Sequence, residues 1–252
     1  MKKVEVFPIT SLPIIKKGDD LASLIIQAAK NQGTPLENGD VVVATHVIVS
    51  RAEGAVIDLE TIKPSKFAQI ISETANKDPR LVEVILRSSK SIVRMRKGKL
   101  ITESKQGIVC ANAGIDQSNV PGNSVVALLP DDPDKSAQQI RKRIFEILEK
   151  DVAVIVSDTH GRPLRHGEIN IAIGTSGFTP LRDRRGENDL FGYKIRVKRT
   201  AIADELACAA ELVIGQTNEG IPVAIIKGYD YPKSETANAT EMTRAPEEDL
   251  FI

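Results

Sequence analysis

The chain has 252 residues, of which 41% are hydrophobic and 27% charged, and its 34 basic side chains balance its 34 acidic ones. This length allows one large domain or two small ones with a sizeable core, and the balanced charge gives no field that would favour nucleic acid or a membrane. A small molecule is therefore the expected ligand. The two cysteines, Cys110 and Cys208, are expected to be buried thiols in a reducing cytoplasm.

The N-terminal segment predicts neither a targeting sequence nor a membrane span. Glu5, Pro8 and Pro13 interrupt any apolar run there, and no window of the chain reaches the ~18 apolar residues that a span needs.

Apolar periodicity then predicts alternating strands and helices in the first half of the chain. The run at 39–50 is almost continuously apolar, as in a strand covered on both faces. In chain order, the predicted elements are a strand at 4–9, a helix at 18–33, a strand at 39–50, and helices at 65–76 and 78–90.

The second half begins with a predicted hairpin at 91–104 that turns at Lys97-Gly98-Lys99. The elements predicted after it are short strands at 107–114 and 124–130, a helix at 132–150, strands at 151–158, 169–177 and 193–200, a helix at 201–215 and a strand at 221–228. Strands and helices do not alternate strictly, so the pattern predicts a mixed α/β (α+β) fold and does not require a doubly wound sheet. The expected domain spans 1–228, with room for two lobes, followed by a polar, loosely ordered tail at 229–252.

The segment "VIVSDTHGRPLRHG" (154–167) is the most distinctive part of the sequence, because an apolar run typical of a buried strand stops at Asp158. An aspartate in that place often only caps a turn. Its Asp-x-His pattern also matches the two-metal site of metallophosphoesterases. That site needs several further histidines, whereas this chain has only His46, His160 and His166. The phosphoesterase interpretation is therefore disfavoured.

A site for a hard cation is the stronger interpretation, since Mg²⁺ and Mn²⁺ prefer oxygen ligands. Carboxylate, amide and hydroxyl side chains gather at predicted strand ends and loops; they are Asp116, Asn119, Asp131, Asp132, Asp134, Asp158 and Thr159. Each could also be a turn residue, and Asp134 is placed to cap the helix that follows it.

Arginines accompany these oxygen donors, and their paired N–H groups suit phosphate and carboxylate recognition. They are Arg162, Arg165, Arg182, Arg184 and Arg185, although a solvated loop would show the same residues. The chain has no Walker motif and no Gly-x-Gly-x-x-Gly. A nucleotide would therefore be held by backbone N–H groups of "GTSG", "GQTNEG" or "TSLPII".

Eight segments, in this order, resemble the coenzyme F420:L-glutamate ligase family: "SRAEG", "ANAGIDQSNV", "LLPDDPDKSA", "VSDTHGRPLRHG", "AIGTSG", "PLRDRRGENDLFG", "ADELACAAELVIG" and "IPVAIIKG". The resemblance covers about residues 4–228. It implies an unusual mixed-sheet homodimer that uses GTP to add L-glutamate to the terminal carboxylate of coenzyme F420-0, and then adds further γ-linked glutamates.

The resemblance also implies roles for individual residues. Two Mn²⁺ or Mg²⁺ ions, with K⁺ possible, would be held by Asp116, Asp158, Thr159 and Gln216. The GTP site would comprise Leu12, Pro13, Ile14, Ile15, His46, Val47, Arg51, Asn119, Ile214, Gly215, Gln216, Thr217, Asn218 and Glu219. Arg51 stands where the family usually has lysine, and Val47 can offer only its backbone. Asp116, Asp158, Arg162 and Arg165 are the expected catalytic residues.

These residue types also suit the chemistry of such a ligase, independently of the resemblance. A carboxylate acylates poorly at neutral pH, but phosphorylation by a nucleotide converts it into an acyl phosphate that an amine can attack. That transfer needs charge neutralisation and positioning more than covalent help. His160, His166 and Glu53 are candidate bases for the amine. A non-catalytic nucleotide- or deazaflavin-binding protein is the remaining alternative.

Overall fold

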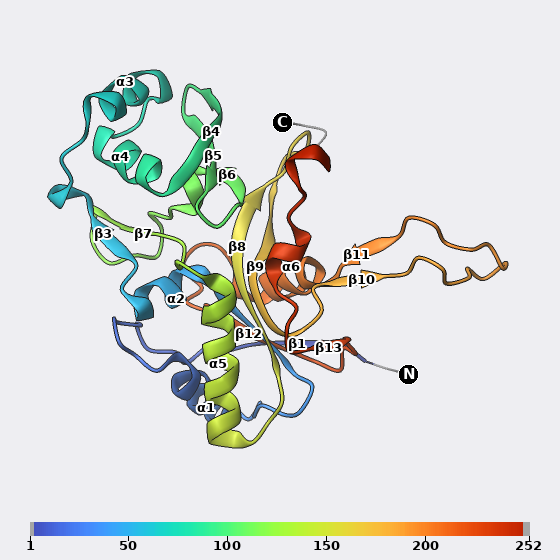
Figure 1. Ribbon diagram of the computed structural model, residues 1–252. Coiled ribbons are helices and arrows are strands. Elements are labelled where there is room, and N and C mark those ends of the chain that lie inside the picture. The colour runs from blue at the N-terminus through green and yellow to red at the C-terminus, as the bar shows by residue number, and fades with distance from the viewer. Residues whose placement is uncertain (1–2, 249–252) are drawn as a thin grey trace.

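The fold is organised around one mixed six-stranded sheet, seen in the computed structural model, which describes residues 3–248 (Figure 1). The strand order is β1-β12-β2-β8-β9-β13, with β2 and β8 parallel and the other neighbours antiparallel. The strands are β1 (Glu5–Pro8), β12 (Val223–Lys227), β2 (Val41–Thr45), β8 (Ala153–Gly161), β9 (Glu168–Phe178) and β13 (Lys233–Ser234). The predicted mixed α/β class is confirmed.

Helices cover both faces of this sheet. Helices α1 (Leu21–Asn31) and α5 (Pro133–Leu148) pack on one face, and α6 (Ile202–Ile214) packs on the other. The central strands are apolar on both sides as a result: in β8, Val154 and Val156 face α1 and α5, whereas Ala153 and Ile155 face α6.

The start of α5 differs from the prediction. Asp132, rather than Asp134, caps the helix, because its carboxylate accepts the Lys135 N–H. Asp134 instead accepts backbone N–H bonds from Thr175 in β9 and from Ala239. It therefore ties the helix to the sheet and to the C-terminal segment.

Strand β9 contains a bulge at Ile173. Val156 pairs with Gly174, but the next residue of β8, Ser157, pairs with Ala172, which leaves Ile173 as the extra residue. The bulge lies where α5 approaches most closely, because a Cβ on Gly174 would sit 2.2 Å from the Pro133 carbonyl oxygen. It reverses the alternation of β9, so Ala172 and Asn170 face α6.

A smaller lobe with its own core lies beside the sheet. It confirms the two predicted helices and the predicted hairpin. Its elements are η1 (Leu59–Thr61), α3 (Lys66–Ala75), α4 (Pro79–Arg87), β4 (Ser89–Arg96), β5 (Lys99–Ser104), β6 (Val109–Ala111) and η2 (Asn112–Gly114). Strands β3 (Val56–Asp58) and β7 (Val125–Ala127) pair where the chain enters and leaves the lobe.

The predicted strand at 39–50 is wrong in its second half. The strand ends at Thr45, and α2 (His46–Glu53) follows directly and ends at Gly54 in the left-handed conformation. A short apolar run such as "HVIVS" suits a buried helix as well as a buried strand, so its hydrophobicity could not separate the two.

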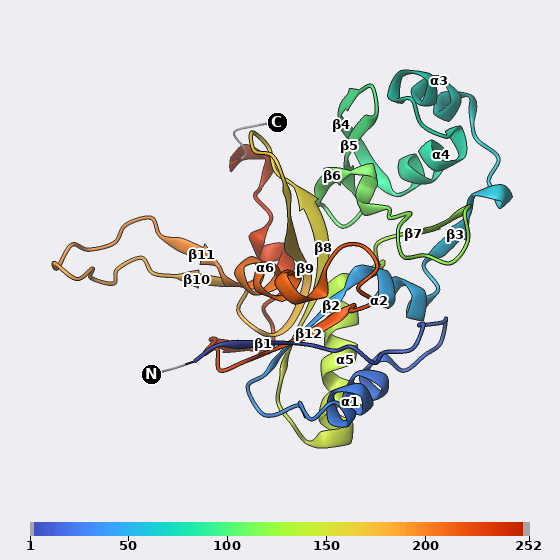
Figure 2. The same cartoon turned by 180° about the vertical axis from the view of Figure 1, so that it is seen from behind.

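The predicted strand at 193–200 is also largely wrong. Its end forms β11 (Arg199–Ala201), which pairs with β10 (Leu181–Asp183), while Lys194 makes an isolated bridge to Asn188. The residues between the two strands form an arm that projects from the body in both views (Figures 1 and 2). The arm carries three strongly exposed apolar side chains, Leu190, Phe191 and Val197.

The C-terminal segment is not loosely ordered within residues 229–248, contrary to the prediction. Strand β13 pairs with β9, and η3 (Ala239–Met242) and η4 (Pro246–Glu248) follow it. Tyr231 is buried with its ring edge-on to Phe178, and Arg141 pairs with Glu235. Residues 249–252 lie outside the described part of the chain.

Helices long and apolar enough to cross a membrane are absent from residues 3–248.

Candidate functional site

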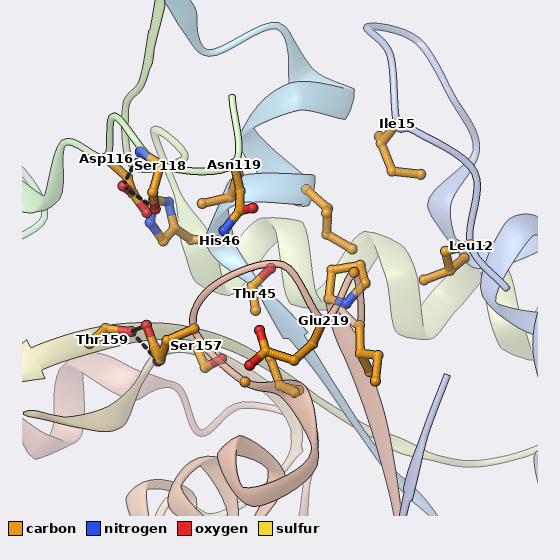
Figure 3. A pocket seen from close by; sticks show the side chains of 18 of the residues that line it. Leu12, Ile15, Thr45, His46, Asp116, Ser118, Asn119, Ser157, Thr159 and Glu219 are labelled. Carbon is orange, nitrogen blue, oxygen red and sulfur yellow. Dashed lines mark hydrogen bonds between the residues drawn. The ribbon is translucent and has the colours of Figure 1, made fainter. Parts of the chain in front are cut away.

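A pocket of about 320 Å³ opens at one end of the central sheet. The parallel strands β2 and β8 reach their C-terminal ends here, and the segments after β1 and before β12 lie at the same end. Such ends of parallel strands are the usual ligand sites of α/β sheets. Figure 3 shows Leu12 and Ile15 on one side of the pocket and Asp116 with His46 on the other.

Six segments that are far apart in the sequence meet in this pocket. They bring together all the residues predicted for nucleotide and metal except Asn218: Leu12, Pro13, Ile14, Ile15, His46, Val47, Arg51, Asp116, Asn119, Asp158, Thr159, Ile214, Gly215, Gln216, Thr217 and Glu219. The shared lining establishes that these residues are neighbours.

Asp158 and Thr159 serve different walls of the pocket because β8 does not stop at Asp158. The strand continues to Gly161, so neighbouring side chains point to opposite faces of the sheet. Asp158 points toward α2, where its Oδ1 lies 3.3 Å from His46 Nε2. Thr159 points toward α6 and the loop after it, where its hydroxyl contacts Gln216.

His46 is a buried histidine whose environment is dominated by acidic groups. Burial opposes its protonation, but the Asp158 carboxylate, aided by Asp116, outweighs that effect and raises the pKa of His46. Neither ring nitrogen makes a well-directed hydrogen bond. His46 therefore lies beside Asp158 as a potential ion-pair partner.

Asp116 is fixed by its own loop. Its backbone bridges to Ala127, and its Oδ1 accepts hydrogen bonds from the N–H and the hydroxyl of Ser118. Arg51 links the loop to α2 by donating to the Asn119 carbonyl at 3.3 Å. These contacts hold Asp116 and Asn119 in the lining of the pocket.

Two pocket residues, Asn170 and Glu211, were not predicted from the sequence. Asn170 lies opposite Thr159 in the β8–β9 pair and is 2% exposed. Its Nδ2 donates to Glu211 of α6, and Glu211 also accepts from Gln216. Burial raises the pKa of Glu211, while these amide donors lower it. The signal available in the sequence was a polar side chain inside a local apolar run, Asn170 within 169–173 and Glu211 within 206–214.

The loop after α6 folds back over the pocket. Gly215 ends the helix with φ of 75°, and a Cβ there would lie 2.4 Å from Glu219 Cδ. Glu219 in turn accepts the Thr217 N–H. Glycine is therefore required for the close return that brings Gln216 to Thr159 and Glu219 into the lining.

The donor set fits a hard divalent cation. Asp116, Asp158, Thr159 and Gln216 all line the pocket and offer carboxylate, hydroxyl and amide oxygens. Within residues 3–248, no lysine or arginine forms an ion pair with either aspartate. In the same range, no three His, Cys, Asp or Glu side chains are grouped closely enough to hold a metal by themselves. The arrangement suits an ion that completes its shell with water and phosphate oxygens.

The predicted arginines do not reach the pocket. Arg162 and Arg165 lie in the exposed turn between β8 and β9, where the Arg162 guanidinium donates to the carbonyls of His166 and Gly167. Arg182, Arg184 and Arg185 lie at the base of the arm, and Asp131, Asp132 and Asp134 lie at the start of α5. For Arg162 and Arg165, the reason is that β8 and β9 are both longer than the apolar pattern indicated.

The three candidate bases also lie outside the pocket lining. Glu53 accepts a hydrogen bond from Ser136 of α5, and burial raises the pKa of its carboxyl. His160 follows Thr159 in β8, and His166 lies in the exposed turn.

Comparison with known proteins gives one consistent family. The sequence profile described as F420-0:Gamma-glutamyl ligase matches residues 10–228. A coenzyme F420:L-glutamate ligase from Methanopyrus kandleri is 47% identical, covering 94% of this chain and 93% of its own. Proteins of the same name from Methanothermobacter thermautotrophicus (44% identical, 98% of each chain) and Methanocaldococcus jannaschii (45% identical, 99% of this chain and 97% of its own) are similarly close.

Proposed function

This chain belongs to the F420-0:gamma-glutamyl ligase family, and on that premise we propose that it joins L-glutamate to the terminal carboxylate of coenzyme F420-0 with GTP as the energy source. The chain is thus a γ-glutamyl ligase of coenzyme F420 biosynthesis. Further glutamates would be added through γ-linkages to the same growing tail.

The proposed reaction has two transfers. An oxygen of the acceptor carboxylate attacks the γ-phosphorus of GTP, the bond to the β-phosphate oxygen breaks, and GDP leaves. The amine of glutamate then attacks the carbonyl carbon of the acyl phosphate, phosphate leaves, and the amine proton passes to a base or to water. Both transfers depend on charge neutralisation and alignment rather than on a protein nucleophile.

The observation that carries the nucleotide part of the proposal is the pocket lining. Leu12 and Ile15 offer an apolar wall, and Arg51 is the single lysine or arginine among the described lining residues. Apolar contact suits a base and ribose, while one guanidinium alone cannot balance a triphosphate. This shortage of positive charge supports a nucleotide that enters together with a divalent cation.

Asp116, Asp158, Thr159 and Gln216 are the residues that we propose to hold Mn²⁺ or Mg²⁺, with two ions and an accompanying K⁺ as the family resemblance implies. When bound, such ions neutralise phosphate charge and orient the phosphoryl group. The protein's own contribution is to fix the four oxygen donors at the sheet end and to keep His46 beside Asp158.

We also propose a cytoplasmic homodimer. The projecting arm supports it, because Leu190, Phe191 and Val197 are each about nine-tenths exposed and a monomer gains nothing from exposing them together. Light scattering of the wild type and of Phe191→Ser tests this: the wild type should have twice the chain mass, and the variant should dissociate more readily. A monomeric wild type would contradict the homodimer.

The decisive experiment for the activity is mass spectrometry of a reaction with GTP, Mn²⁺, L-glutamate and coenzyme F420-0. A gain in whole glutamate units, with matching GDP release, supports the ligase. Phosphate release from a simple ester without nucleotide would support a phosphoesterase, and tight binding without any product would support a non-catalytic binding protein.

A further inference from the structure

Four polar side chains form a continuous hydrogen-bonded chain along the α6 side of the pocket. Thr159 Oγ1 lies 3.1 Å from Asn170 Oδ1, and Asn170 Nδ2 lies 2.5 Å from Glu211 Oε2. The other oxygen of Glu211 accepts from Gln216 Nε2, which also lies 2.9 Å from Thr159 Oγ1. Glu211 is thus the charged member of the group, and like Thr159 it contacts both amides.

Glu211 determines which way both amides face. An ionised carboxylate can only accept hydrogen bonds, whereas an amide offers donors at one end and an acceptor at the other. Because Glu211 takes an N–H from Asn170 and another from Gln216, each amide must turn its nitrogen toward Glu211. The oxygens of both amides are consequently turned to the opposite side.

The orientation of the Asn170 amide in turn determines where the Thr159 hydroxyl donates its proton. A hydroxyl has a single proton, and Asn170 Oδ1, buried in β9, is the acceptor fixed in front of it. Thr159 donates there, and its oxygen accepts from Gln216 Nε2 at 2.9 Å, which leaves the hydroxyl oxygen one lone pair. Gln216 Oε1, 3.1 Å from the same hydroxyl oxygen, then receives no proton from Thr159. Two oxygens with unused lone pairs are thus left side by side.

The spacing of these two oxygens matches that of neighbouring cation ligands. An octahedral ion with ligands at about 2.1 Å places adjacent oxygens about 3.0 Å apart, and the observed separation is 3.1 Å. A hydrogen bond would satisfy only one of them, whereas a cation satisfies both.

We propose that Glu211 is a positioning residue, which holds Gln216 directly and Thr159 through Asn170 so that both present oxygen to the divalent cation. This inference rests on the proposed function in one respect: the ligand of the Thr159 and Gln216 oxygens is a divalent metal. Glu211 acts through the two amides and is not itself a ligand.

The test measures Mn²⁺ binding to the full chain with GDP present. The concentration of free Mn²⁺ is read from its electron paramagnetic resonance signal. Glu211→Gln should raise the Mn²⁺ Kd by about 10- to 100-fold, as loss of a supporting partner does at other metal sites, because a glutamine cannot accept from both amides. Glu205→Gln, an exposed acidic residue on the same helix, removes the same charge and should leave the Kd unchanged.

A double-mutant cycle separates orientation from charge. In a Gln216→Glu background the side chain at 216 has two equivalent oxygens, so only the link from Glu211 through Asn170 to Thr159 remains to be oriented. Glu211→Gln should then cost clearly less Mn²⁺ affinity than it does in the wild-type background. An equal loss in both backgrounds would overturn the proposal, because it would mean that Glu211 acts by charge or by direct ligation.

Asn170→Leu provides an independent variant if Glu211→Gln does not fold. It leaves the net charge unchanged and frees the Thr159 proton to bond Gln216 Oε1 in competition with the metal, so the Kd should rise by about tenfold. An unchanged Kd overturns the inference. If the wild type itself binds no Mn²⁺, the metal site of the proposed function fails and the inference with it; if the wild type binds and the variants match it, the inference fails alone.

Discussion

The two ends of residues 154–167 behave differently although they form one motif in the sequence. Asp158 and Thr159 line the pocket and contact α2, β9 and the loop after α6. Arg162 instead donates to the backbone of its own turn, and Leu164 is 92% exposed. Strand β8 runs three residues beyond Asp158, which moves the turn about 10 Å away at the ordinary rise per residue. Nearness in sequence therefore does not make one site; the length of the strand decides which residues share it.

Removing the negative charge of Asp158, at the pocket end of the segment, should lower turnover more than any other change. Asp158→Asn is expected to lower turnover by at least about 100-fold, more than the loss of a supporting residue costs, while the melting temperature stays close to that of the wild type because asparagine has nearly the same shape. Asp131→Asn, an exposed aspartate outside the lining, is the matched control. Near-normal turnover of Asp158→Asn would show that Asp158 is only a structural partner of His46. Asp116→Asn should behave like Asp158→Asn.

Metal removal should have the next largest effect, which we expect to be a loss of affinity for the nucleotide. Calorimetry with a non-hydrolysable GTP analogue is expected to show at least about tenfold weaker binding in EDTA than in Mn²⁺, because Arg51 is the single lysine or arginine in the described lining. Equal affinity in the two buffers would contradict the idea that the pocket needs a cation to receive phosphates.

The arginines of the turn should have a smaller and more selective effect. Arg162→Lys and Arg165→Lys keep the charge but lose the paired donors. We expect the KM for glutamate or for coenzyme F420-0 to rise by about three- to tenfold, and the affinity for the GTP analogue to stay within about twofold, because neither guanidinium lines the pocket. Wild-type values for every substrate would show that the turn is only solvated, and a loss confined to GTP would contradict the division between the two ends.

The smallest effect should come from the tip of the turn. Leu164 has φ of 63°, a conformation that asparagine tolerates better than leucine. Leu164→Asn should raise the free energy of unfolding by roughly 0.5 to 1 kcal/mol in urea denaturation, with turnover unchanged. A fall in turnover would instead show that this exposed leucine touches a substrate.

The elements with clear periodicity could be predicted from the sequence, and the site only in part. Helix α5 and strand β12 follow from their apolar spacing. Helix α2 could not be predicted, because its first residues are as apolar as the strand before it. Tertiary packing, rather than local sequence, determines that the strand ends at Thr45.

The site residues that escaped prediction are those whose role depends on three-dimensional neighbours. Asp116 and Asp158 lie in recognisable motifs, so they could be named in advance. Asn170 and Glu211 lie inside apolar elements, and their importance comes from facing Thr159 and Gln216 across a strand pair and a helix end. A periodic pattern contains no information on such partners.

The bulge at Ile173 has a consequence for insertions and deletions. Because Ile173 is the extra residue, its loss would let β9 pair with β8 through an unbroken ladder that keeps Asn170 opposite Thr159 and facing Glu211. If the bulge instead straightened with Ile173 retained, the register would slip by one residue and Asn170 would turn to the opposite face. Among natural or designed variants, a one-residue gap at Ile173 should therefore preserve the support for Thr159.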